Sequence, residues 1–73
     1  MTLGEERVRI SFNPSGDSHV EEIKRLSAKL IDICNDLRNN TPSEAARLWS
    51  LAMTDYEKAA MWAVKAATFP KAP

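Results

Sequence analysis

The chain of 73 residues contains only one cysteine and one histidine, two residue types from which many catalytic and metal sites are built. It has one cysteine, which excludes an internal disulfide and a thiolate zinc cluster. Cys34 stands among leucines and isoleucines, which favours a buried apolar role, and the single histidine, His19, is expected to face solvent. No HExxH motif, phosphate-binding loop or dinucleotide fingerprint occurs. We therefore expect no enzyme activity, no metal site and no cofactor.

The sequence also lacks an excess of charge and a long apolar run. Ten basic and ten acidic side chains cancel, whereas binding to nucleic-acid polymers depends on an excess of Lys and Arg. The longest uninterrupted apolar stretch, 59–64, is far shorter than the roughly 20 residues of a membrane span. The charged N-terminus carries no apolar segment typical of a signal peptide. These features predict a cytoplasmic protein that binds neither polymeric nucleic acid nor a membrane.

Three segments of regular structure are predicted within a single domain, 1–73. Alternation of apolar and polar residues in 7–12 (RVRISF) predicts a short strand or extended segment. The segments 18–38 and 42–68 show the apolar periodicity of helices. Because only a few residues connect them, they should pack as an antiparallel two-helix hairpin. The fold class is therefore mainly α.

Both helices are predicted to begin with a capping box, in which a hydroxyl and a carboxylate satisfy free backbone N–H groups. Ser18 pairs with Glu21 in the first helix. Thr41 pairs with Glu44 in the second, where Pro42 takes the first helical position. The stripe through which the second helix contacts the first is predicted to consist of Ala45, Trp49, Ala52, Tyr56, Ala59, Ala63 and Ala67.

The second helix carries more apolar side chains than one partner helix can cover. Outside the predicted stripe lie Leu48, Leu51, Met53, Ala60, Met61, Trp62 and Val64. A two-helix hairpin buries one face of each helix, so the remaining apolar surface needs a partner chain. The simplest partner is a second copy related by symmetry. We therefore predict a homo-oligomer.

The end of the second helix combines aromatic rings with cations. At steps of four, three and four, one side of the helix presents two lysines and two aromatics, namely Lys58, Trp62, Lys65 and Phe69. Aromatic faces stack on nucleobases, Lys and Arg bind phosphates, and Ser, Thr and Asn bind oxygens and ring edges. The candidate ligand-binding residues are Phe12, Asn13, Ser15, Lys24, Arg47, Thr54, Trp62 and Lys65. Two alternatives stay open, because Trp62 also suits an oligomer core and Lys65 also suits an interface that its stem covers.

Two long segments, FNPSGDSHVEEIKRLSAKLIDI and EAARLWSLAMTDYEKAAMWAVKAAT, resemble the helical-hairpin domain shared by phage Thoeris anti-defence and anti-CBASS sponge proteins. The resemblance extends from about Arg7 to Phe69. It rests on the FNPS turn, the Ile23–Lys24 pair, the T-x-x-E spacing and the MWAVKA run. Members of that family form homo-oligomers, commonly dimers arranged as hexamers, and bind cyclic nucleotide immune signals without cleaving them.

The resemblance implies roles for individual residues and for the whole chain. It implies that Phe12 stacks on a base and that Lys24 reaches a phosphate. It places Arg47, Thr54 and Lys65 near other ligand contacts. The implied function is a non-catalytic sponge that sequesters cyclic di- or trinucleotides or cyclic ADP-ribose isomers and so blocks bacterial anti-phage defence. The alternative is a helical protein–protein interaction module, such as a dimeric adaptor or anti-repressor, that binds no small molecule.

Overall fold

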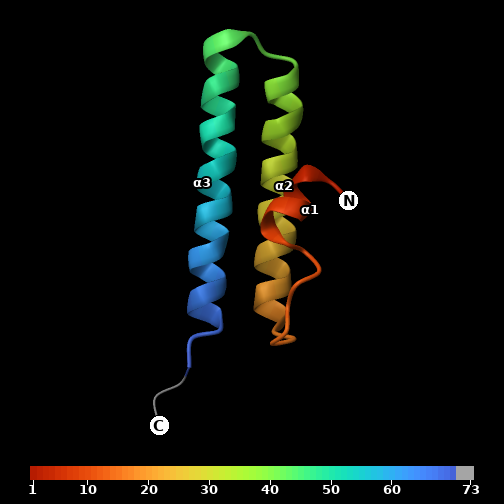
Figure 1. Ribbon diagram of the computed structural model, residues 1–73, viewed down its shortest axis with the longest axis vertical. Coiled ribbons are helices and arrows are strands. Elements are labelled where there is room, and N and C mark those ends of the chain that lie inside the picture. Colours follow the sequence, from red (N-terminus) through yellow and green to blue (C-terminus); the bar gives the residue numbers. More distant parts are fainter. Residues whose placement is uncertain (71–73) are drawn as a thin grey trace.

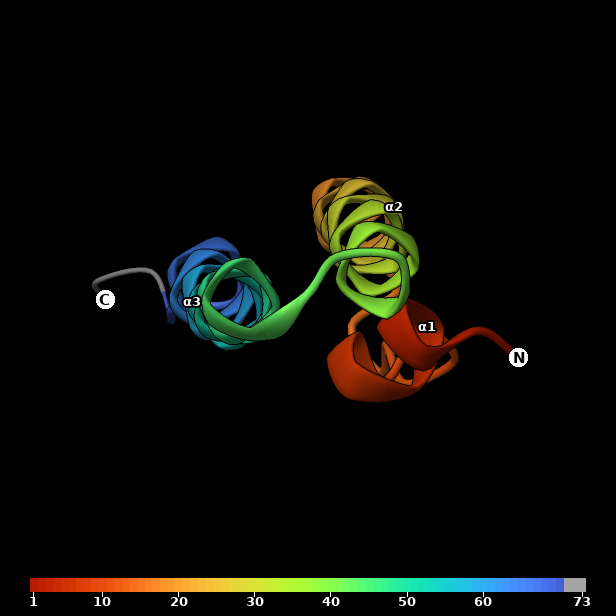
Figure 2. The ribbon, with the colours of Figure 1, turned by 90° about the horizontal axis from the view of Figure 1, so that it is seen from above.

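The computed structural model describes residues 1–70, which form three helices (Figure 1). These are α1 (Leu3–Val8), α2 (Ser18–Asn39) and α3 (Ser43–Ala67). The long helices α2 and α3 run antiparallel as a hairpin, and α1 packs mainly against α2 on one side of it (Figure 2). The mainly helical class is thus confirmed. Positions 71–73 of the predicted domain lie outside the described residues.

The strand predicted over 7–12 is wrong, because residues 1–70 contain three helices and no strand. The chain is already helical at Leu3, where Thr2 and Glu5 form a capping box that was not among the predicted ones. Thr2 Oγ1 accepts a hydrogen bond from the Glu5 N–H at 3.1 Å, and Glu5 Oε1 accepts one from the Thr2 N–H at 2.8 Å. Six alternating residues specify a strand only when another strand is there to pair with it, and the described chain offers none.

Both predicted caps of the long helices are also wrong. Asp17, one residue before the predicted Ser18, caps α2, because its carboxylate accepts two backbone N–H groups at 2.7 and 3.2 Å. At the start of α3, the Thr41 hydroxyl instead donates to the Leu37 carbonyl at 2.5 Å. The N-cap residue of α3 is Pro42, whose side chain makes no cap hydrogen bond.

Six buried residues from the three helices form one core. It contains Val8, Ala28, Ile31, Cys34, Met53 and Ala60. Cys34 is 4% exposed, which confirms the prediction of a buried thiol. The core is small, so each buried side chain carries a large share of the apolar burial on which the stability of a short chain depends.

The contact between α3 and α2 uses a stripe one residue later than the predicted one. Met53 and Ala60 are 0% and 5% exposed, whereas the predicted Ala52 and Ala59 are half-buried and exposed. A step of one residue turns a side chain by about 100° around a helix. Met53 fills the space between the helices with a long, flexible side chain that an alanine cannot replace. The prediction favoured small residues and left Met53 outside the stripe, which was wrong.

The helix α1 is held closely against α2 at Gly4. A Cβ at this position would lie 2.1 Å from the Ala28 carbonyl oxygen, so only glycine permits the approach. The Gly4 N–H donates to Asp32 Oδ1 at 2.7 Å and ties the first turn of α1 to α2. This contact fixes where α1 ends and therefore where the following residues lie.

Candidate functional site

A cavity of about 390 Å³ opens between the end of α1, the segment after it, and the C-terminal half of α3. It is lined by Arg7, Val8, Arg9, Phe12, Lys24, Glu57, Ala60, Met61, Val64 and Lys65. The volume falls within the range of about 300–1,000 Å³ that small-molecule sites occupy. Three of the predicted ligand-binding residues, Phe12, Lys24 and Lys65, come together here from three parts of the chain. We call it the Phe12 cavity.

Lys24 supports the Phe12 cavity from α2. The residue is 6% exposed, and its Nζ donates hydrogen bonds to the Arg9 carbonyl at 3.0 Å and to the Phe12 carbonyl. Burial of the ammonium group, with the nearby Arg9 charge as a smaller cause, lowers the pKa of Lys24 from its ordinary value of 10.5. Lys24 therefore holds the segment between α1 and α2 in place. The resemblance implies a phosphate ligand for Lys24, and its hydrogen bonds to the backbone were not predicted.

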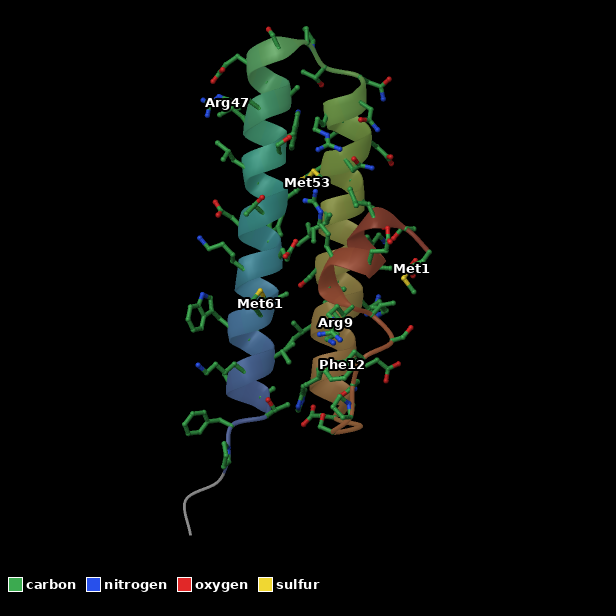
Figure 3. All side chains as sticks on the ribbon, in the orientation of Figure 1. Met1, Arg9, Phe12, Arg47, Met53 and Met61 are labelled. Carbon is green, nitrogen blue, oxygen red and sulfur yellow. The ribbon has the colours of Figure 1, made fainter. Side chains whose placement is uncertain are left out.

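The Phe12 ring stands at the mouth of the cavity and not in the core. It is 53% exposed, and cations approach it from two residues. Arg9 Cζ lies 4.4 Å and Lys24 Nζ 5.5 Å from the ring centroid, which are cation–π distances. Figure 3 shows Arg9 and Phe12 close together below α1. An exposed aromatic ring among cations can stack on a flat, anionic ligand.

Asn13 and Ser15 lie in the turn that follows Phe12, and neither lines the cavity. Ser15 Oγ donates to Asn13 Oδ1 at 2.8 Å, and Asn13 Nδ2 donates to the Asp17 carbonyl at 3.0 Å. Their polar groups therefore stabilise the turn that leads into α2. In this structure they hold Phe12 in position.

Arg47 and Thr54 lie away from the cavity. Figure 3 places Arg47 near the hairpin turn, whereas Phe12 lies toward the opposite end. Arg47 forms an exposed ion pair with Glu44, with Nη2 and Oε1 2.5 Å apart. The Thr54 hydroxyl donates to the Ser50 carbonyl at 3.3 Å within α3. One protomer thus does not bring these two residues to Phe12.

Trp62 lies on the outer surface of α3. The residue is 66% exposed, and Lys65 Nζ lies 5.6 Å from its ring centroid. Lys58, Met61, Trp62 and Lys65 line an apolar hollow there. Lys65 also borders the Phe12 cavity, so it is shared by the two surfaces.

The side of the hairpin that faces away from α1 is apolar. Ala28 of α2 meets α1, and Leu30, two residues later, points about 200° away from it around the helix. In α3, Ala59 is likewise two residues before Met61, which borders the Phe12 cavity beside α1. Both helices therefore contribute to one surface opposite α1, which we call the apolar face. It consists of Leu26, Leu30, Ile33, Leu37, Ala45, Leu48, Ala52, Tyr56 and Ala59, all exposed or half-buried.

Several residues of the cavity were not among the predicted ones, and one of them, Arg9, has its Cζ 4.4 Å from the centroid of the Phe12 ring. Arg9 lies within the segment 7–12 that was predicted as a strand, and that prediction does not place Arg9 beside Phe12. The spacing of Thr2 and Glu5 was the signal that a helix precedes Arg9.

Comparison with known proteins agrees with this architecture. The sequence profile of the family described as Acb2/Tad1, hairpin domain, matches residues 4–68. No curated protein and no solved structure matches the chain. Within residues 1–70, no helix has the length and apolar character needed to cross a bilayer, and no group of three metal-ligating side chains occurs. Because the match covers nearly the whole chain, the protein belongs to the Acb2/Tad1 hairpin-domain family of phage anti-defence sponges.

Proposed function

We propose that this protein is a sponge that binds cyclic nucleotide immune signals without cleaving them and thereby blocks bacterial anti-phage defence. The ligands are cyclic di- or trinucleotides or cyclic ADP-ribose isomers. The Phe12 cavity carries the proposal, because it joins an exposed aromatic ring to several cations. Signals of this kind act in the cytoplasm of the infected cell, so the proposal includes a cytoplasmic location.

The charge of the cavity differs from that of the whole chain. Ten basic and ten acidic side chains cancel overall, yet the cavity is lined by Arg7, Arg9, Lys24 and Lys65 with Glu57 as the single carboxylate. This local excess of cations favours a small anion over a long nucleic-acid polymer. The Phe12 ring offers a stacking surface for a base, at about 1–3 kcal/mol per contact.

The lining of the cavity also supports binding without chemistry. Among the described residues, the side chains of its lining apart from Glu57 are aliphatic, aromatic, thioether, guanidinium or ammonium groups, and no hydroxyl, thiol or imidazole is among them. A hydrolytic site needs a nucleophile or a water held by a base within hydrogen-bond reach. A ligand held here should therefore leave unchanged.

The proposal includes a homo-oligomer, between a dimer and a hexamer. Leu30, Ile33 and Leu48 on the apolar face are 42%, 48% and 52% exposed. Soluble monomers rarely expose a contiguous apolar surface of this extent, and a symmetric second copy would cover it. Association of several copies is also the route by which Arg47 and Thr54 would reach a shared ligand site.

One binding experiment tests the function. The protein is titrated with a panel of cyclic di- and trinucleotides and cyclic ADP-ribose isomers, then heat-denatured, and the released ligand is analysed by mass. We expect tight binding of at least one member and recovery of the intact ligand. Recovery of a cleaved product would instead identify an enzyme.

The apolar face favours a second candidate function, a helical module that binds another protein. In that case no member of the panel binds. Light scattering tests separately whether copies of this chain cover the apolar face. We expect a mass that is a multiple of 8.2 kDa, reduced toward 8.2 kDa in Leu30→Glu and unchanged in the adjacent control Lys29→Glu. A stable wild-type monomer would contradict the oligomer.

A further inference from the structure

Arg9 adopts a backbone conformation that is unfavourable for its side chain. Its φ and ψ are 55° and 58°, in the left-handed region, and it ends α1 by donating its N–H to the Glu5 and Glu6 carbonyls. Glycine or asparagine usually fills such a position, because other residues crowd their own backbone there. An arginine in this strained position raises the question of what its side chain contributes.

The Arg9 side chain lies beside the Phe12 ring. Its Cζ lies 4.4 Å from the centroid of the exposed Phe12 ring. Within residues 1–70 the guanidinium makes no ion pair with a carboxylate and no side-chain hydrogen bond, whereas Lys24 Nζ is held by two backbone carbonyls. Of the two cations beside the ring, the Arg9 guanidinium is therefore the one that has no ion-pair or hydrogen-bond partner within these residues.

The distance between the two groups determines how a ligand enters. A stacked ring lies about 3.5–4 Å from each neighbour, so 4.4 Å leaves no room for a base between guanidinium and phenyl. A base that stacks on this face of Phe12 must take the place that Arg9 occupies. The backbone of Arg9 stays fixed by the α1 cap and by Lys24, and only its side chain needs to turn.

We infer that Arg9 is a specificity-determining residue of the Phe12 cavity. This inference rests on the proposed function. Arg9 covers the Phe12 ring in the free protein. When a ligand enters, the Arg9 side chain turns away, a base stacks on the ring, and the guanidinium binds a phosphate of the same ligand. The planar guanidinium suits two phosphate oxygens at once. The site therefore selects ligands that carry a phosphate within one side-chain length of a stacked base.

Three substitutions of Arg9 test the inference against the ligand that binds most tightly in the panel. Arg9→Asn and Arg9→Gly keep a residue that tolerates the left-handed backbone but remove the charge. We expect the Kd to rise at least tenfold in both, with a weaker dependence on salt. Arg9→Lys keeps the charge without the planar fork, and we expect a smaller loss. Lys29→Gln, an exposed charge outside the cavity, is the control and should bind as the wild type does.

Melting of the free variants separates ligand binding from a structural role. Because glycine removes the backbone crowding, Arg9→Gly should melt no lower than the wild type. A fall in both melting temperature and affinity would make Arg9 a structural residue and overturn the inference. Unchanged affinity in Arg9→Asn, with a wild type that binds, overturns the role of Arg9 alone. A wild type that binds no member of the panel overturns the proposed function and this inference together.

Discussion

The two ends of the hairpin differ in what lies beside α2 and α3. Near the hairpin turn only these two helices are present, and Arg47 pairs with Glu44 on an open surface (Figure 3). At the other end, α1 and the segment after it add a third layer, and a cavity of about 390 Å³ forms between the layers. Toward the turn, the hollow lined by Ala45, Leu48, Trp49 and Ala52 lies on α3 alone, and no cation is among its described lining residues. The six-residue helix α1, with the segment after it, is what adds cations and the Phe12 ring to the cavity at the other end.

The largest effect is expected from removing that third layer. In Gly4→Ala the new Cβ would lie 2.1 Å from the Ala28 carbonyl oxygen, so α1 must move away from α2. We expect a loss of about 1–3 kcal/mol in the free energy of unfolding, measured in urea, and loss of ligand binding. Gly16→Ala shows the cost of backbone strain without a clash, because no atom lies within 4 Å of the Cβ that it would add. Unchanged stability in Gly4→Ala would mean that α1 does not depend on this contact.

The next prediction distinguishes the flat aromatic face of Phe12 from its apolar volume. Since the residue is 53% exposed, Phe12→Leu should barely change the melting temperature. It should cost roughly 1–3 kcal/mol of ligand affinity by calorimetry, because leucine has no flat face. Phe12→Tyr keeps the ring and should bind as the wild type does. If the leucine variant retained full affinity, the ring would have no part in the site.

Lys24 is expected to give a moderate effect with a pH signature. Lys24→Met keeps the stem but cannot donate to the Arg9 and Phe12 carbonyls, so ligand affinity should fall about tenfold, or 1.4 kcal/mol. The lowered pKa of Lys24 gives the sign of the pH dependence. Between that pKa and 10.5 the unfolded chain binds more protons, so the wild type gains stability as pH rises.

Comparison with Lys24→Met isolates the pH-dependent contribution of Lys24 to the free energy of unfolding. The stability of the wild type relative to the variant should increase as the pH rises from the lowered pKa of Lys24 toward 10.5, measured in urea at each pH. Arg7, Arg9, Glu57 and Lys65 line the same cavity, but they are present in both proteins and their contributions should cancel. A difference that does not change with pH would indicate that the pKa of Lys24 is not lowered.

The smallest effect is expected at the open end. Both side chains of the Arg47–Glu44 ion pair are exposed, and such pairs contribute little to stability. Arg47→Ala should leave the melting temperature of the free protein unchanged. If several copies share a ligand site that includes Arg47, the same variant should lose affinity in the oligomer. Loss of ligand affinity without loss of stability would indicate that Arg47 of one copy contributes to a ligand site on another copy.

Much of the hairpin was predictable from the sequence, and the contact between its helices was not. Helical periodicity gave 18–38 and 42–68, close to the observed Ser18–Asn39 and Ser43–Ala67. The contact stripe of α3 was placed one residue early because α3 is apolar over more than half of its circumference, and periodicity alone then does not determine which side faces α2. The long side chain of Met53, which decides the packing, looked like surplus apolar surface.

The site was also predicted only in part, because tertiary contacts decide which residues meet there. Phe12 and Lys24 were chosen for their chemistry, and their proximity followed from a turn between them. Arg9 was missed because its segment alternates like a strand, and its position depends on the tertiary contact at Gly4, which no local pattern in the sequence reveals. Arg47 and Thr54 were included through the resemblance, and one protomer does not bring them to the cavity.

The attachment of α1 through Gly4 and Lys24 also has a consequence for local unfolding. A six-residue helix has little stability of its own, so α1 can open as a separate cooperative unit while α2 and α3 stay folded. The amides of α1 should therefore exchange with solvent deuterium faster than those in the middle of the hairpin. Because the Phe12 cavity exists only when α1 is closed, a bound ligand should slow exchange in α1 more than in the hairpin. The exchange rate of this one short helix thus measures the fraction of molecules that are competent to bind.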